Sequence, residues 1–247
     1  MPHTLVTGAN SFVASHIINE LIASGHTVTG CVRRPTAGDA ILNTHPEWQE
    51  KLSIAIVEDY TQQDVLDKIF KARQYDHVIH VAIPWTSSPT ADFGTAWLQP
   101  SVNGILALLR SIAVTGSILA ATTGSRAELL NIIFTNAFGT PLTSATARAS
   151  ANIMLAYASS TKEAERARCG PQVYSLSDGT FAEVPGTHGV LFPSYVDVRN
   201  LATAHVRALT EPRVRGRRAL VGGMALLATA VVEAMGRLAG REGAEGR

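Results

Sequence analysis

The opening stretch of the chain sets a strand, a glycine turn and an amphipathic helix in that order, and this order constrains the fold more than any other feature. Residues 3–7 predict a buried strand, and apolar positions at helical spacing run from Val13 until Gly25 ends the pattern. A second β-branched run follows at residues 27–32. Strands separated by helices of this length form parallel sheets through right-handed crossovers. The sequence therefore predicts an α/β fold with a doubly wound parallel sheet.

The same alternation continues along the chain. Further strands are predicted at residues 52–57, 77–81 and 129–134. Thr61 and Asp64 have the spacing of a capping box that opens a helix. A later helix is expected to have a buried face formed by Val102, Ile105, Leu106, Leu109 and Ile112. We also expect helices at residues 152–168, 198–209 and 225–238, with Asp197 as the cap of the second.

The periodic pattern weakens near residue 170, and we expect the chain to divide there. Residues 1–170 carry the alternation of strands and helices, whereas residues 171–240 form a shorter C-terminal region rich in Gly and Pro. Residues 241–247 are small or charged and predict a frayed tail.

Composition excludes several classes of function. The 247 residues carry 21 Lys and Arg against 20 Asp and Glu, a formal charge of +1, which provides no basic surface for nucleic acid or an anionic membrane. The uncharged stretch 129–147 contains too many polar residues for a membrane span. Cys31 and Cys169 have no metal-ligand spacing, and His77 and His80 point to opposite faces of a strand. We therefore expect a cytoplasmic protein without a metal, nucleic acid or membrane partner.

The turn after the first strand has features of a phosphate-binding loop. Gly8 begins it, Ser11 stands where a second glycine is usual, and Ala14 closes it. From the turn alone, a nucleotide site and an ordinary strand-to-helix turn remain open alternatives. Arg33 and Arg34 follow the second strand, where an NAD site has an acidic residue, and their guanidinium groups can clamp a 2′-phosphate. They favour NADP(H), the alternative being a solvated loop.

Ten short blocks of sequence carry a family resemblance. They read VTGAN (6–10), FVASH (12–16), VR (32–33), VED (57–59), DHVIHVA (76–82), PSVNG (100–104), IFT (133–135), AYASS (156–160), YVDVRN (195–200) and AH (204–205). Together they resemble the extended short-chain dehydrogenase/reductases of the NAD-dependent epimerase/dehydratase superfamily, and among these the dihydroflavonol-reductase-like group with its fungal ketone and aldehyde reductases. The resemblance implies a Rossmann-type fold and hydride transfer between NADPH and the carbonyl carbon of a small molecule.

The resemblance also implies the residues of the site. The cofactor-binding positions are Gly8, Ser11, Phe12, Val13, Arg33, Asp59, Ala82, Thr135 and Tyr157. In the family a Ser-Tyr-Lys set performs catalysis, so Tyr157 is expected to be the proton donor, and Lys162 to lower its pKa and hold the nicotinamide ribose.

The catalytic set departs from the family pattern at two positions. Ala137 stands at the serine position, so the hydrogen-bond donor would have to be Asn136 or Thr135. The usual lysine position, four residues after Tyr157, holds a threonine, and Lys162 lies about 140° around a helix from Tyr157. A curled side chain, a π-bulge and a solvated lysine without a catalytic role all remain open.

A third departure is length, because the segments that shape the family's substrate region are shortened after residue 137 and again after residue 176.

Two functions follow from the sequence as hypotheses. The first is an NADP(H)-dependent oxidoreductase that reduces a ketone or aldehyde of a small molecule, such as a secondary metabolite, with Tyr157 as proton donor. The alternative is a catalytically degenerate protein of the same fold, acting as a non-redox helper or as an isomerase or cyclase in a biosynthetic pathway.

Overall fold

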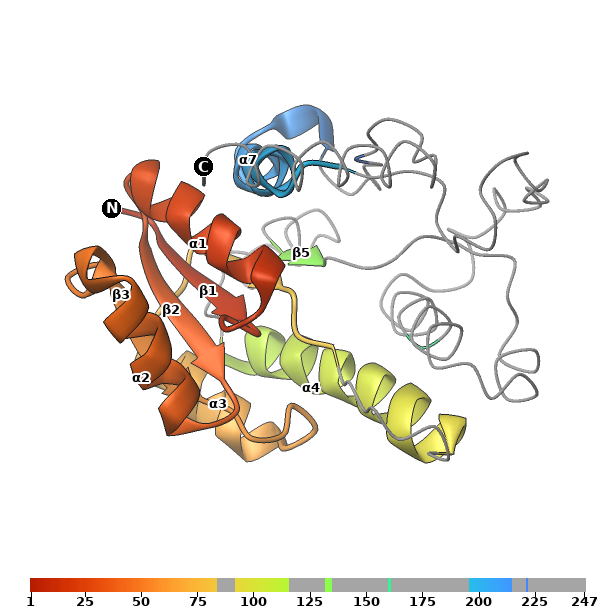
Figure 1. Ribbon diagram of the computed structural model, residues 1–247. Coiled ribbons are helices and arrows are strands. Elements are labelled where there is room, and N and C mark those ends of the chain that lie inside the picture. Colours follow the sequence, from red (N-terminus) through yellow and green to blue (C-terminus); the bar gives the residue numbers. More distant parts are fainter. Residues whose placement is uncertain (84–91, 116–131, 135–159, 161–195, 215–220, 222–247) are drawn as a thin grey trace, which may run out of the picture.

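A single parallel sheet organises the chain. The computed structural model describes residues 1–83, 92–115, 132–134, 160, 196–214 and 221. Its strands are β1 His3–Thr7, β2 Thr27–Val32, β3 Leu52–Ile56, β4 His77–His80 and β5 Ile132–Phe134. They pair in parallel in the order β3-β2-β1-β4-β5, so the chain moves outward from β1 to β3 and then returns to β4 on the other side of β1 (Figure 1). The predicted doubly wound parallel sheet is confirmed.

Helices cover both faces of this sheet. They are α1 Phe12–Ala23, α2 Pro35–Thr44, α3 Gln63–Ala72, α4 Gln99–Thr115 and α7 Val198–Ala208, with short helical turns at Pro46–Trp48, Gly94–Leu98 and Pro212–Val214. Helices α1 and α7 pack together on one face, and α3 and α4 pack together on the other (Figure 1).

The alternation of side chains along β1 and β4 divides the core into two layers. Val6 and Ile79 belong to the layer that includes α1 and α7, whereas Leu5 and Val78 belong to the layer with α3 and α4. All five residues of β1 are buried, as expected of a central parallel strand covered on both faces. Each such aliphatic side chain contributes about 1.5–3 kcal/mol on burial, so the strand ends that carry the site are firmly held.

Helix α1 ends before Gly25 and α7 begins after Asp197, both as predicted, whereas α7 ends one residue earlier than predicted. Ser11 is the N-cap of α1, and Gly25, with φ of 85°, follows its C-cap. Asp197 caps α7, where its carboxylate accepts a hydrogen bond from the Arg199 N–H at 2.8 Å. Strands β1 and β2 also have their predicted limits, and β3 and β4 each end one residue earlier than predicted.

The capping box at residue 61 was a wrong prediction. Helix α3 has Gln62 as its N-cap, without a side-chain cap. Thr61 instead donates from its N–H and from its hydroxyl to the Asp59 carboxylate, both at 2.8 Å. A charged acceptor two residues away makes the stronger hydrogen bonds, and it draws Thr61 out of the helix start.

The predicted inner face of α4 is also corrected. Val102, Leu106 and Leu109 are only half-buried, whereas Leu108 and Ser111 are fully buried. Helix α4 follows the π-helical turn Gly94–Leu98, in which the Gln99 N–H donates to the Gly94 carbonyl. Ile105 and Ile112 are buried as predicted, and the small residues Ser101, Gly104 and Ala107 complete the buried face, which a pattern of large apolar residues does not predict.

Helix α2 was not predicted at all. It begins with Pro35 at its first turn, and Gly38 is its one buried residue. A Cβ at Gly38 would lie 2.7 Å from the Ile54 side chain, so the helix approaches β3 closely at this glycine, and Ala37, Ile41 and Leu42 pack against the core beside it. The helices predicted at 152–168 and 225–238 and the strand start at 129–131 lie outside the described residues. In the part of the chain that the structure describes, no helix has the length and apolarity needed to cross a membrane.

Candidate functional site

The turn between β1 and α1 requires glycine at position 8. Gly8 has φ of 67°, a conformation that residues with a Cβ rarely adopt. A Cβ on Gly8 would also lie 3.0 Å from the Ala82 Cα, just beyond the end of β4. Gly8 therefore lets the turn lie directly against the neighbouring strand at the carboxyl edge of the sheet, where ligands of open α/β sheets bind.

Ser11 uses its side chain for the helix that follows. Its Oγ accepts a hydrogen bond from the Ala14 N–H at 3.3 Å. The N–H groups of Phe12 and Val13 belong to the same first turn, which has no intrahelical acceptors and attracts anions. The Phe12 side chain is 70% exposed beside this turn. The serine thus replaces a glycine while keeping a helix N-terminus suited to a phosphate.

The hydroxyl of Thr7 joins the ends of β1 and β4. It accepts hydrogen bonds from the N–H groups of Val81 and Ala82, each at 3.1 Å. Those two bonds use both of its lone pairs, so its proton is directed to Nδ1 of His80, 2.9 Å away. Burial lowers the pKa of His80 to about 4. His80 is therefore neutral at pH 7 and carries its proton on Nε2.

Tyr60 extends beneath the glycine turn. Its hydroxyl accepts a hydrogen bond from the Gly8 N–H at 3.3 Å, and its ring meets the His80 ring edge-on at 6.0 Å between centroids. Burial, and then the neighbouring Cys31 thiol, raise the pKa of Tyr60 well above 10. Burial likewise raises the pKa of Cys31 to about 12. Both groups stay protonated at physiological pH, which leaves the floor of the site uncharged.

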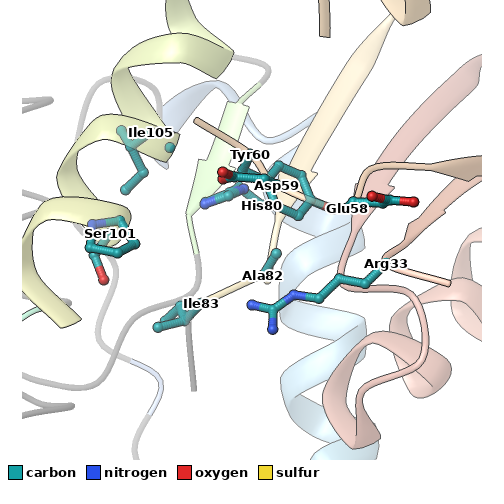
Figure 2. Close-up of a pocket in the computed structure, with 11 residues that line it drawn as sticks. Arg33, Glu58, Asp59, Tyr60, His80, Ala82, Ile83, Ser101 and Ile105 are labelled. Atoms are coloured by element: carbon teal, nitrogen blue, oxygen red, sulfur yellow. The ribbon is translucent and has the colours of Figure 1, made fainter. Parts of the chain in front are cut away.

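A hollow opens beside this turn (Figure 2). Its walls come from the ends of three strands and from α4, namely Arg33, Glu58, Asp59, Tyr60, His80, Ala82, Ile83, Pro100, Ser101, Gly104 and Ile105. Figure 2 shows Ser101 and Ile105 on one side of the hollow and Arg33 on the other, with Tyr60, His80 and Ala82 between them. The hollow thus combines a charged rim, with one guanidinium and two carboxylates, with apolar and uncharged polar groups inside.

The charged residues at the rim come from β2 and β3. Arg33 directly follows β2 and is exposed, and Glu58 and Asp59 follow β3. The Asp59 carboxylate is oriented by the two hydrogen bonds from Thr61. Arg34 is exposed as well, at the N-cap of α2, but it does not line the hollow. The two arginines, which the sequence could not separate, therefore differ in position.

The structure brings several of the expected site residues to one edge of the sheet. Arg33, Asp59 and Ala82 line one hollow, and Gly8 contacts Ala82. Ser11, Phe12 and Val13 form the start of α1 at the same edge. The remaining residues of the expected site, Thr135, Ala137, Tyr157 and Lys162, lie outside the described residues.

Three residues of the hollow were missed as site residues. Tyr60 follows Asp59 directly, but the block that carried the resemblance stopped at residue 59. Ser101 lay within a block without a role, and His80 was considered only as a metal ligand. Within the described residues, no group of three or more His, Cys, Asp or Glu side chains is placed to hold a metal ion.

Comparison with known proteins identifies the family to which the chain belongs. A model of the NAD dependent epimerase/dehydratase family matches residues 4–127, about half of the chain. The chain belongs to this family. Among its epimerase/dehydratase relatives, an oxidoreductase of Schizosaccharomyces pombe is 26% identical over 88% of this chain and 76% of its own length. Aldehyde reductase 2 of Sporidiobolus salmonicolor is 33% identical over 118 residues, 46% of this chain and 32% of that protein.

Solved structures agree with the fold. Yeast methylglyoxal/isovaleraldehyde reductase Gre2, complexed with NADPH, matches with a TM-score of 0.68 at 22% identity, over 89% of this chain and 78% of the yeast protein. The resemblance to extended short-chain dehydrogenase/reductases and the Rossmann-type fold are thereby confirmed.

Proposed function

We propose that this protein is an NADP(H)-dependent oxidoreductase that reduces a ketone or an aldehyde of a small molecule. The observation that carries the proposal is the hollow beside the Gly8 turn, because it has Arg33 at its rim where an NAD site has a carboxylate. The aldehyde reductase and the NADPH-bound yeast reductase named above support the same cofactor and substrate class.

The residues of the hollow fit the adenosine half of NADP(H). The guanidinium of Arg33 suits the 2′-phosphate, and the carboxylate of Asp59 can accept a hydrogen bond from an adenine amino group. The turn at Gly8 leaves no room for a Cβ because it lies directly against Ala82, which lines the same hollow. Ser101 has a buried hydroxyl without a hydrogen-bond partner among the described residues, which a polar ligand atom would satisfy.

NADPH, when bound, supplies the hydride that reduces the carbonyl carbon. Tyr157 donates the proton to the carbonyl oxygen, and Lys162 lowers the pKa of the Tyr157 hydroxyl. In this proposal residues 1–170 bind the cofactor and residues 171–240 bind the substrate. We further propose a secondary metabolite as the substrate and the cytoplasm as the location.

One sequence observation favours a second candidate function. Ala137 replaces the catalytic serine, and Lys162 is one residue away from the usual lysine position. A protein with these changes could retain the fold and act as a non-redox helper, or as an isomerase or cyclase that uses Tyr157 as an acid.

Titration of the purified protein with NADPH, followed by cofactor fluorescence and with NADH as control, tests the first proposal. We expect saturable binding with preference for NADPH, and NADPH oxidation with a member of a broad aldehyde and ketone panel. Tyr157→Phe should abolish turnover and keep cofactor binding. No cofactor binding would refute the proposal. Binding without turnover, with activity gained only in the Ala137→Ser, Thr161→Lys double variant, would favour the second candidate.

A further inference from the structure

Ser101 is a buried polar residue in an otherwise apolar row. Its side chain is 5% exposed, and its Oγ has no hydrogen-bond partner among the described residues. Along the helix it stands at four-residue spacing between Trp97 and Ile105, both of which are buried. A buried hydroxyl without a partner costs stability, so its presence in this row calls for a reason.

The local backbone directs Ser101 toward the hollow. The π-helical turn Gly94–Leu98 ends three residues before it and sets the orientation of the side chains that follow. Phe93 and Trp97 pack on each other in a small cluster of their own, whereas Ser101 and Ile105 line the hollow (Figure 2). π-Turns of this kind are frequent at functional sites.

The neighbouring polar groups of the hollow already have partners. The Tyr60 hydroxyl accepts from Gly8, the Asp59 carboxylate accepts from Thr61, and Thr7 bonds to His80. Among the buried polar side chains that line the hollow within the described residues, Ser101 is the one whose hydroxyl has no hydrogen-bond partner. Ile83 and Ile105 make the adjoining surface apolar. A hydroxyl in an apolar wall suits a flat heterocycle with apolar faces and polar ring nitrogens at its edge.

We propose that Ser101 is a specificity-determining residue that hydrogen-bonds the adenine base of the nucleotide. The proposal rests on the proposed NADP(H) site and adds a group outside its expected residues. Binding supplies the hydroxyl with its missing partner, so Ser101 lowers the stability of the free protein and strengthens the complex.

Ser111 provides a matched control on the same helix. It is 0% exposed, but its hydroxyl donates to the Asp67 carboxylate at 2.7 Å and it is bonded to Gln63 as well. It lies outside the hollow. Removal of this hydroxyl breaks contacts between α3 and α4 without touching the site.

The experiment compares wild type, Ser101→Ala and Ser111→Ala by thermal unfolding without ligand and by calorimetric titration with NADPH and with adenosine 2′,5′-bisphosphate. For Ser101→Ala we expect an unchanged or higher melting temperature, and about three- to tenfold weaker binding of both ligands. For Ser111→Ala we expect a lower melting temperature and unchanged affinity.

Three results would overturn the assignment of Ser101. They are unchanged affinity in Ser101→Ala, a loss confined to NADPH and absent for the bisphosphate, or a Ser101→Ala protein that is destabilised or unfolded without ligand. Absence of NADPH binding by wild type would refute the proposed function itself, and the role of Ser101 with it.

Discussion

The hydroxyl of Tyr60 accepts a hydrogen bond from the backbone N–H of Gly8 at 3.3 Å, although the two residues are 52 positions apart in the chain. The bond joins the end of β3 to the turn after β1. Two parts of the site that come from separate crossovers are thereby held in one position.

Removal of this hydroxyl should loosen the turn. Tyr60→Phe keeps the ring against His80 but leaves the Gly8 N–H without its acceptor, so we expect a loss of about 1 kcal/mol in the free energy of unfolding. Urea denaturation of the two proteins measures the difference. A midpoint equal to that of wild type would show that the bond contributes nothing.

Two glycines with positive φ allow a comparison of strain with steric contact. Gly25 has φ of 85° and open space where a Cβ would lie, whereas a Cβ on Gly8 would meet Ala82 at 3.0 Å. Gly25→Ala should cost about 1 kcal/mol from backbone strain alone. Gly8→Ala should cost clearly more and should also weaken NADPH binding. Chemical denaturation gives both values, and equal losses would contradict the close contact at Gly8.

Arg33 and Arg34 should differ in their effect on cofactor choice. We expect Arg33→Ala to weaken NADPH binding about tenfold or more and to leave NADH binding nearly unchanged, since a charge-assisted bond to a phosphate contributes about 1.5–3 kcal/mol. Arg34→Ala should change neither, because Arg34 does not line the hollow. Fluorescence titrations with both cofactors provide the measurement. Equal losses in the two variants would indicate a general charge effect.

Acidification should destabilise the protein through its buried histidines. Burial, and then the Arg73 guanidinium, lower the pKa of His3 to about 4 against the opposing effect of Asp76, and burial lowers the pKa of His80 to about 4. Burial also lowers the pKa of His26 and His77. Between pH 6.5 and pH 4 the unfolded chain thus binds more protons than the folded chain, so the free energy of unfolding falls as pH falls.

Urea denaturation at several pH values between 7 and 4 tests this dependence. We expect the free energy of unfolding to be highest above pH 6.5 and to decline below that pH. His3→Gln should reduce the slope, because one of the titrating groups is removed. A free energy of unfolding that is constant from pH 7 to pH 5 would contradict the neutral state of these histidines.

The regular parts of the fold could be predicted because local pattern and tertiary packing agree there. β1 is buried on both faces and has Leu5 and Val6 between threonines, and α1 has both a cap and an apolar stripe. Helix α2 was missed because its apolar residues Ala37, Ile41 and Leu42 are only partly buried and its one fully buried residue is Gly38. The inner face of α4 was predicted only in part, because small residues such as Ser101 and Ser111 lie on it.

The candidate site was predicted where it depends on backbone shape and missed where it depends on distant contacts. Gly8 could be recognised from its place between a strand and a helix. The roles of Tyr60 and Ser101 depend on which side chains approach them from other crossovers, and no local pattern contains that information.

The bond between Thr7 and His80 has a consequence for folding. The two residues are separated by 73 positions, so the edge of the sheet that carries the site is completed only by a contact of high sequence separation. Without β4, the Thr7 hydroxyl lacks its His80 partner and the Gly8 turn lacks the surface of Ala82. A chain interrupted before residue 77 would therefore lack one whole wall of the hollow.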